Sequence, residues 1–214
     1  MRIIGLTGGI GCGKSTVSRY LNKLGFKTID FDQTMKELQK PGQPALAEIV
    51  EAFGPKALLP DGTMNRKYVG KIVFSDPEKK KVLDKIMQSH LDVIVTSQTD
   101  AFEREGRGVT RETNPDDYMQ KKVIFYDHPL LFEVPYKIEP ADEAWVIDMD
   151  EELRIERVNL RDGMSRDDII NRMHSQMSRS EKLARADYVI DNSGSIEDLK
   201  KNVDLALAKL NTRI

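Results

Sequence analysis

The stretch Gly8-Gly9-Ile10-Gly11-Cys12-Gly13-Lys14-Ser15-Thr16 decides the fold. It fits the pattern G-x-x-x-x-G-K-[ST], in which a glycine-rich turn between a strand and a helix surrounds phosphate groups. The apolar residues 2–7 before it predict a short buried strand, and Val17, Leu21 and Leu24 recur after it at helical spacing. Backbone N–H groups and a helix N-terminus would then point at one place. The sequence therefore predicts an α/β fold with a phosphate-binding core.

The residues of this loop have separate expected roles. Lys14 can reach the β- and γ-phosphates of ATP, and the hydroxyl of Ser15 can ligate Mg²⁺. The alternative is a glycine-rich turn that binds nothing, but strand, helix, lysine and serine are all in place. The residues predicted to bind ATP here are Gly11, Cys12, Gly13, Lys14, Ser15 and Thr16.

Composition limits the class of protein only broadly. The 214 residues, 39% of them hydrophobic, suffice for one substantial core with attached lobes. A net charge of −2 provides no basic field for nucleic acid, so we expect no nucleic-acid partner. One cysteine excludes an internal disulfide framework and fits a reducing compartment. No apolar run approaches the roughly 20 residues of a membrane span. Because the first residues form a core strand, no signal peptide is expected, and the predicted location is the cytoplasm.

A carboxylate pair follows the second predicted strand, residues 26–30. Ligands of open α/β sheets bind beyond the carboxyl ends of the strands, so Asp30 and Asp32 are well placed to face the nucleotide. Alternation along an extended segment would put both on the same side. One of them could instead cap the next helix. We favour function for Asp32, and capping or support for Asp30.

Residues 33–121 predict a helical substrate-binding lobe. Apolar residues recur at helical spacing in 45–53 and 64–74, and a third helix begins near Pro77 and runs past residue 94. A helical insertion of this length between two core strands is a lobe rather than a crossover. Residues 97–121 are polar and contain two glycines, which predicts a surface loop.

The chain returns to strand character at residues 123–127. An apolar strand that ends in Asp127 resembles a Walker B element, which holds Mg²⁺ directly or through water. Further strands are predicted at 144–148 and 186–192, and Ser195 is placed to cap a final helix. The predicted core thus comprises residues 1–32, 122–150 and 186–214.

A helical lid is predicted at residues 151–185. Transfer of a phosphoryl group needs cations on the moving group, and a mobile lid is a usual way to bring them. Interspersed acidic residues leave ordinary helix-surface charge as an alternative, so we expect one or two of these arginines to touch phosphate. Arg161 is the first choice, and Arg157 lies one turn before it. The six arginines of this cluster are Arg154, Arg157, Arg161, Arg166, Arg172 and Arg179.

Taken together, these stretches resemble the dephospho-CoA kinases over nearly the whole chain. The most specific are residues 127–133, Asp-His-Pro-Leu-Leu-Phe-Glu, and residues 186–192, Ala-Asp-Tyr-Val-Ile-Asp-Asn. The other matching stretches are residues 5–17, 29–32, 41–42, 65–66, 73–77, 161–162, 176 and 193–194.

The resemblance implies transfer of the ATP γ-phosphoryl group to the ribose 3′-hydroxyl of dephospho-CoA, the last step of CoA synthesis. It implies a P-loop kinase core with a parallel sheet flanked by helices, plus a helical substrate lobe and a helical lid. By analogy Asp32 is the catalytic carboxylate, Arg161 belongs to the lid, and Asn192 lies near the adenine. Lys36 and Arg66 are the further substrate-binding candidates. The implied partners are ATP and dephospho-CoA, with Mg²⁺ as cofactor.

Three features depart from the family pattern. Lys36 stands where the family usually has arginine, and it keeps the charge but loses the bidentate fork. Gln88-Ser89 occupies the place of the family's His-Pro, with His90 nearby. Cys12 stands where serine is frequent. A thiol at a helix N-terminus could have a lowered pKa and sense redox state, although we favour a tolerated small side chain.

Two other functions remain open on the sequence. Another P-loop kinase of a nucleotide or small metabolite would share the loop and the lid but differ in residues 33–95. A nucleotide-driven switch protein would carry an Asn-Lys-x-Asp stretch for guanine, and the sequence has none. The expected assembly is a monomer or a small homo-oligomer.

Overall fold

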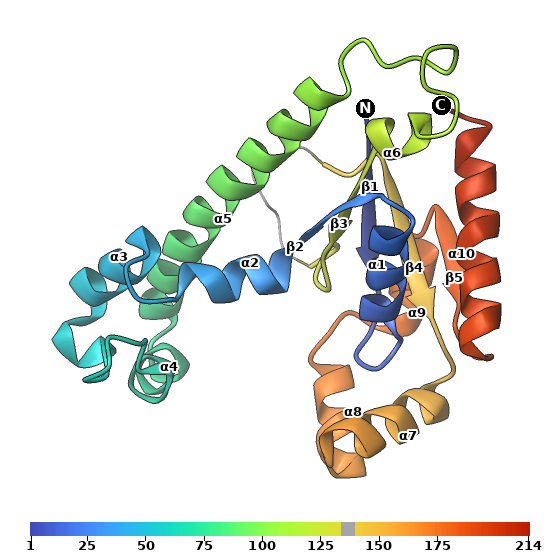
Figure 1. The fold of residues 1–214 in the computed structure, drawn as a ribbon. Coiled ribbons are helices and arrows are strands. Elements are labelled where there is room, and N and C mark those ends of the chain that lie inside the picture. The colour runs from blue at the N-terminus through green and yellow to red at the C-terminus, as the bar shows by residue number, and fades with distance from the viewer. Residues whose placement is uncertain (134–139) are drawn as a thin grey trace. The chain divides into compact units, whose positions relative to one another are not determined.

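The computed structural model describes residues 1–133 and 140–214, and their contacts separate them into two units (Figure 1). The first unit contains residues 1–30, 99–133 and 140–214, and the second contains residues 31–98. The predicted division into core, substrate lobe and lid remains a prediction about how these residues work.

A parallel sheet of five strands forms the centre of the first unit. Its order is β2-β3-β1-β4-β5, and every neighbouring pair is parallel. Because parallel strands end at one edge of the sheet, the segments that follow them gather there. The predicted α/β fold with a parallel sheet is confirmed. The strands are β1 (Arg2–Thr7), β2 (Lys27–Asp30), β3 (Val123–Asp127), β4 (Glu143–Asp148) and β5 (Tyr188–Asp191).

Two helices cover one face of the sheet. α1 (Lys14–Lys23) and α10 (Ile196–Asn211) contribute Leu21 and Val203 to a buried cluster with the strands. Alternate strand residues meet them, and the rings of Phe125 and Trp145 lie edge to face at 5.5 Å. The side chain of Ser195 accepts a hydrogen bond from the Asp198 N–H, so the predicted cap of α10 is confirmed.

The last turns of α5 (Pro77–Glu105) contact the opposite face of the sheet. The hydroxyls of Thr99 and Tyr126 are 2.6 Å apart, and Thr99 and Phe102 are buried. The prediction of a surface loop over residues 97–121 is therefore wrong at both ends, because 97–105 continue the helix and α6 (Tyr118–Lys122) follows. Only the segment between α5 and α6 is irregular.

Three short helices lie near the carboxyl ends of the strands in Figure 1: α7 (Glu151–Asp162), α8 (Arg166–His174) and α9 (Arg179–Ala184). Each begins at a capping side chain that accepts a backbone N–H of the first turn, and these side chains belong to Asp150, Ser165 and Ser178 respectively. Ile155 and Val158 of α7 pack with Ile169 of α8 in a small apolar cluster.

The second unit is helical. Its elements are α2 (Phe31–Leu38), α3 (Pro44–Phe53), the short 3₁₀ turn η1 (Pro55–Ala57), α4 (Arg66–Ser75) and the first part of α5. Asn65 caps α4 through the Tyr68 N–H, and Asp76 accepts the N–H of Glu78 at the start of α5.

The structure corrects the expected geometry of the carboxylate pair. α2 begins at Phe31, immediately after β2, so Asp32 lies in the first helical turn rather than in an extended segment. The alternation that would have put Asp30 and Asp32 on one side therefore does not apply. A carboxylate in a first turn is favoured by the helix dipole.

Among the helices of residues 1–133 and 140–214, none is both long enough and apolar enough to span a membrane.

Candidate functional site

The phosphate loop joins the end of the central strand β1 to the start of α1. Gly11 and Gly13 have φ angles of 79° and 91°, a region that favours glycine because it lacks a Cβ. Gly13 is the N-cap of α1 and provides no side-chain cap, so the helix N-terminus faces the loop with its backbone. This arrangement directs the positive end of the helix dipole into the loop, where it favours the binding of an anion.

Lys14 and Asp127 form the charged centre of the site. The Lys14 ammonium pairs with the Asp127 carboxylate, and their side chains are only 15% and 3% exposed. Asp127 is the last residue of β3 and lies opposite Leu6 of β1, so the sheet register brings it to the loop. The structure therefore joins two residues that the sequence predicted separately, one for phosphate and one for Mg²⁺.

Ser15 follows Lys14 as the second residue of α1, and it is exposed. Among the described residues, no group of three His, Cys, Asp or Glu side chains could hold a metal alone. Magnesium is commonly held by one or two protein oxygens together with substrate phosphates and water. Ser15 and Asp127, both oxygen donors beside a phosphate loop, fit that requirement.

Cys12 is buried, and its Sγ lies so near Gly8 that a Cβ there would overlap it. Burial raises the pKa of the Cys12 thiol, and the Lys14 N–H and the Arg154 and Lys14 charges only partly oppose this effect. The thiol is therefore protonated at neutral pH. The lowered pKa considered from the sequence is not what this environment produces, and the side chain serves as packing.

Side chains from later segments hold the outer side of the loop. The guanidinium Nε of Arg154 donates to the carbonyl oxygen of Ile10 at 2.9 Å, and the Ile10 N–H donates to Oε1 of Gln176 at 3.1 Å. Asn192 donates from Nδ2 to the carbonyl oxygen of Cys12 at 2.8 Å. Both backbone polar groups of Ile10 are therefore satisfied, which fixes the shape of the loop before any ligand binds.

Arg154 was only one of the six clustered arginines of the predicted lid, and its contact with the loop was missed. Its guanidinium lies against Gly9, where a Cβ would overlap it. The side chain is buried, and this burial lowers the pKa of Arg154 from its ordinary value. One signal was available: Arg154 is on the first turn after β4, nearest the end of the sheet.

The two arginines chosen from the sequence lie further along α7. Arg157 donates from one terminal nitrogen to the carbonyl oxygen of Gly194 at 3.4 Å, beside Asn192. Arg161 forms a bidentate pair with Asp162 at 2.7 Å, and its side chain is 62% exposed. Arg157 therefore contacts the segment that follows Asn192.

The remaining predicted residues belong to the second unit. Asp32 and Lys36 are exposed and lie one turn apart on α2, on neighbouring positions of one helix face. Arg66 is the first residue of α4 and is exposed. His90, near the departure from the family's His-Pro, contacts Glu48 at 2.9 Å.

His128 follows Asp127 and is neutral at pH 7. Burial lowers the pKa of His128 to about 4, helped by the Lys14 charge and opposed by that of Glu133. Its Nδ1 accepts the N–H of Leu130 at 3.0 Å, which supports the turn after β3.

A parallel sheet with a phosphate loop on its central strand, a largely enclosed lysine at the end of that loop and an arginine that contacts it from a later helix defines a P-loop kinase. Residues 2–198 match the family model described as dephospho-CoA kinase. The chain belongs to the dephospho-CoA kinase family.

Individual proteins and solved structures are similar to this chain over nearly its whole length. A dephospho-CoA kinase of Carboxydothermus hydrogenoformans is 41% identical over 97% of this chain and 93% of its own. A solved structure from Thermus thermophilus has a TM-score of 0.77 at 29% identity, covering 98% of this chain and 97% of that one. A dephospho-CoA kinase structure from Campylobacter jejuni has a TM-score of 0.64 at 27% identity, covering 98% of each chain.

Proposed function

We propose that this protein transfers the γ-phosphoryl group of ATP to the ribose 3′-hydroxyl of dephospho-CoA, which gives CoA and ADP. The observation that carries this proposal is the family match over residues 2–198. The preformed phosphate loop supports it, because positioned N–H groups and a lysine are what a transferring phosphoryl group requires.

The loop binds ATP through its backbone and the N-terminus of α1. The Lys14 ammonium neutralises charge on the β- and γ-phosphates, and the backbone around Gly11, Gly13 and Thr16 surrounds them. Asn192 contributes near the adenine, as the family resemblance implies, and its Nδ2 donates to the Cys12 carbonyl oxygen of the loop. Arg157 lies on the same side, next to Gly194.

Asp32 acts as the general base. The ribose hydroxyl gives its proton to the Asp32 carboxylate while its oxygen forms a bond to the γ-phosphorus. The bond from that phosphorus to the bridging oxygen breaks, and ADP leaves with the electron pair. Asp32 suits this role because it is exposed and lies directly after β2, whose carboxyl end is at the ligand-binding edge of the sheet.

The other groups act on charge and on the acceptor. Bound Mg²⁺ would neutralise developing charge on the phosphates, and Ser15 and Asp127 are the residues that would hold it. Arg161 brings further positive charge to the transferring group from the lid segment. Lys36 and Arg66 are exposed cations of the second unit that suit the phosphates of dephospho-CoA.

We place the enzyme in the cytoplasm, as a monomer or small homo-oligomer without a nucleic-acid partner. The support is a single buried thiol and a net charge of −2.

The purified protein should convert dephospho-CoA and Mg-ATP into CoA. Mass spectrometry identifies the product, and phosphorus NMR locates the new phosphate on the 3′-oxygen. A parallel panel with adenosine phosphates and other small hydroxyl compounds tests the remaining P-loop kinase activities. Turnover of one of those acceptors, with none of dephospho-CoA, would overturn the proposal.

A further inference from the structure

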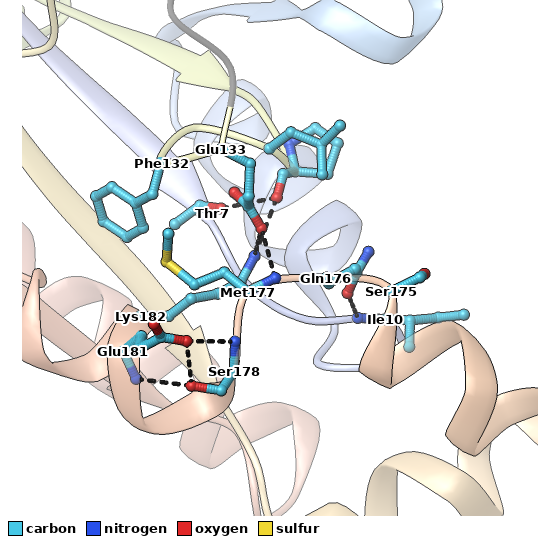
Figure 2. Close-up of polar contacts among 12 residues, drawn as sticks. Thr7, Ile10, Phe132, Glu133, Ser175, Gln176, Met177, Ser178, Glu181 and Lys182 are labelled. Carbon is cyan, nitrogen blue, oxygen red and sulfur yellow. Dashed lines mark hydrogen bonds and ion pairs between the residues drawn. The ribbon is translucent and has the colours of Figure 1, made fainter. Parts of the chain in front are cut away.

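The linker between α8 and α9, residues 175–178, contacts two segments at the edge of the sheet (Figure 2). Oε1 of Gln176 accepts the Ile10 N–H of the phosphate loop at 3.1 Å. The next residue, Met177, donates its backbone N–H to Oε1 of Glu133 at 3.1 Å. Two adjacent residues of one linker thus join the phosphate loop to the segment that follows β3.

A buried charge pair fixes the second of these contacts. Lys182 of α9 donates to the same Oε1 of Glu133 at 2.7 Å and to the Pro129 carbonyl oxygen at 3.4 Å. The side chains of Lys182 and Glu133 are only 3% and 19% exposed. A carboxylate held this way has little freedom to turn, so it presents Oε1 to Met177 in a fixed direction.

The far end of the linker is also fixed. Ser178 caps α9 by accepting the Glu181 N–H, while the Glu181 carboxylate accepts the N–H of Ser178, as Figure 2 shows. Between the helix cap and the contact to Glu133, the backbone at Met177 is held on both sides. Gln176 is therefore presented to Ile10 from a rigid support.

We propose that Glu133 is a positioning residue for phosphoryl transfer, which acts through Met177 and Gln176 on the Ile10 N–H of the phosphate loop. Lys14 and Asp127 join the loop directly to the end of β3, and this route joins it to the segment that follows β3. A loop that must hold phosphate oxygens loses rate when it shifts by fractions of an ångström. This inference rests on the proposed kinase activity.

The test is a double-mutant cycle with variants that conserve volume. Glu133→Met/Lys182→Met removes the acceptor of the Met177 N–H together with both charges, so no buried charge is left alone. Gln176→Met removes the acceptor of the Ile10 N–H and leaves the buried pair intact. Each should lower kcat about tenfold to a hundredfold. The triple variant should be no more than about twofold slower than Gln176→Met, because both changes break one route.

Two further variants separate positioning from general packing. Glu133→Gln/Lys182→Met keeps an Oε1 acceptor for Met177 and should restore kcat to within about threefold of wild type. The matched control is Glu152→Met/Arg166→Met, which removes an exposed ion pair between α7 and α8. It should leave kcat within about twofold, as exposed pairs contribute little.

Multiplicative effects in the triple variant, or a Glu133→Gln/Lys182→Met variant as slow as the Met pair, would overturn the inference. Wild-type kcat in Gln176→Met would do so even if the Glu133→Met/Lys182→Met chain fails to fold. Hydrogen exchange of the Ile10 amide, followed by NMR without substrate, gives a readout independent of the acceptor. It should accelerate at least tenfold in Gln176→Met and in Glu133→Met/Lys182→Met. If wild type turns over no dephospho-CoA, the kinase proposal fails, and unchanged exchange separately refutes the positioning route.

Discussion

The ammonium group of Lys14 pairs with the carboxylate of Asp127, although the two residues are 113 positions apart in the sequence. The parallel pairing of β1 with β3 places Asp127 opposite Leu6, two residues before the phosphate loop. One register therefore sets the distance between the group proposed to contact phosphate and the group proposed to hold Mg²⁺. Because the pair is largely shielded from water, removal of either side chain leaves the other charge without its partner.

Lys14→Ala should abolish most phosphoryl transfer, because the γ-phosphate loses a positioned cation. It should also lower the free energy of unfolding by about 3–5 kcal/mol, since Asp127 is left as a buried charge without its partner. Steady-state kinetics and urea unfolding measure the two effects. The control is Lys200→Ala on the exposed side of α10. Near-wild-type turnover in the variant would contradict the role given to the loop.

Asp32→Asn keeps size and hydrogen bonding but removes the proposed general base. We expect kcat to fall by about 10²–10⁴, the usual contribution of a positioned base, with ATP binding little changed. Asp127→Asn should instead raise the Mg²⁺ concentration needed for half-maximal rate. Titration of each variant with ATP and with Mg²⁺ separates the two effects.

The two carboxylates serve as controls for each other. Normal turnover in Asp32→Asn, together with an Asp127→Asn variant that is inactive at every Mg²⁺ concentration, would mean that their roles are reversed.

The arginines of α7 should fall into two kinetic classes. Arg154→Ala should weaken ATP binding, because the Ile10 carbonyl oxygen loses its donor and the loop relaxes; an unsatisfied buried group costs about 1–3 kcal/mol. Arg161→Ala should lower kcat more than it weakens ATP binding, since an exposed lid cation acts on transition-state charge. Calorimetric Kd and saturating kcat are the measurements. If ATP affinity collapses in Arg161→Ala while kcat is retained, Arg161 is a ground-state contact.

The Cys12 thiol should resist modification. Burial and its raised pKa keep it protonated, so the native protein at pH 8 should react with a thiol reagent at least a hundredfold more slowly than the unfolded chain. Cys12→Ser should retain kcat within a few-fold, because only packing is altered. Rapid labelling of the native protein, accompanied by loss of activity, would instead support a redox role for Cys12.

Arg111→Ala should destabilise the first unit. The guanidinium donates to the main-chain oxygens of Asn211 and Ile214 and lies 4.8 Å from the Tyr118 ring centre, so it ties the segment between α5 and α6 to the end of α10. Loss of these contacts should lower the free energy of unfolding by about 1–2 kcal/mol. Thermal melting measures it, with exposed Arg107→Ala as control. Equal melting temperatures would contradict this role.

The sequence was sufficient for features that are specified locally. Residues 2–24 carry strand periodicity, the glycine turn and helix periodicity in order, and β1 and α1 follow them. The extended geometry expected at Asp32 was wrong because three residues cannot distinguish a continuing strand from a first helical turn. The end of α5 was missed because residues 97–105 are mostly polar, and only Thr99 and Phe102 reveal a buried side.

The outer support of the phosphate loop could not be predicted in the same way. Arg154 looks like its neighbours in sequence, and its contact with Ile10 exists only once α7 lies over the loop. Gln176 is separated from Ile10 by 166 positions, and a polar residue in a linker carries no periodic signal. Such contacts depend on tertiary packing, which short-range patterns do not encode.

The position of β1 at the centre of the sheet has a consequence for synthesis. Both of its neighbours, β3 and β4, come much later in the chain, and the Ile3 N–H finds its acceptor on Asp142, 139 positions away. A growing chain therefore carries an apolar strand without partners until most of the protein has left the ribosome. During that interval its exposed apolar surface is of the kind that chaperones shield and through which nascent chains aggregate.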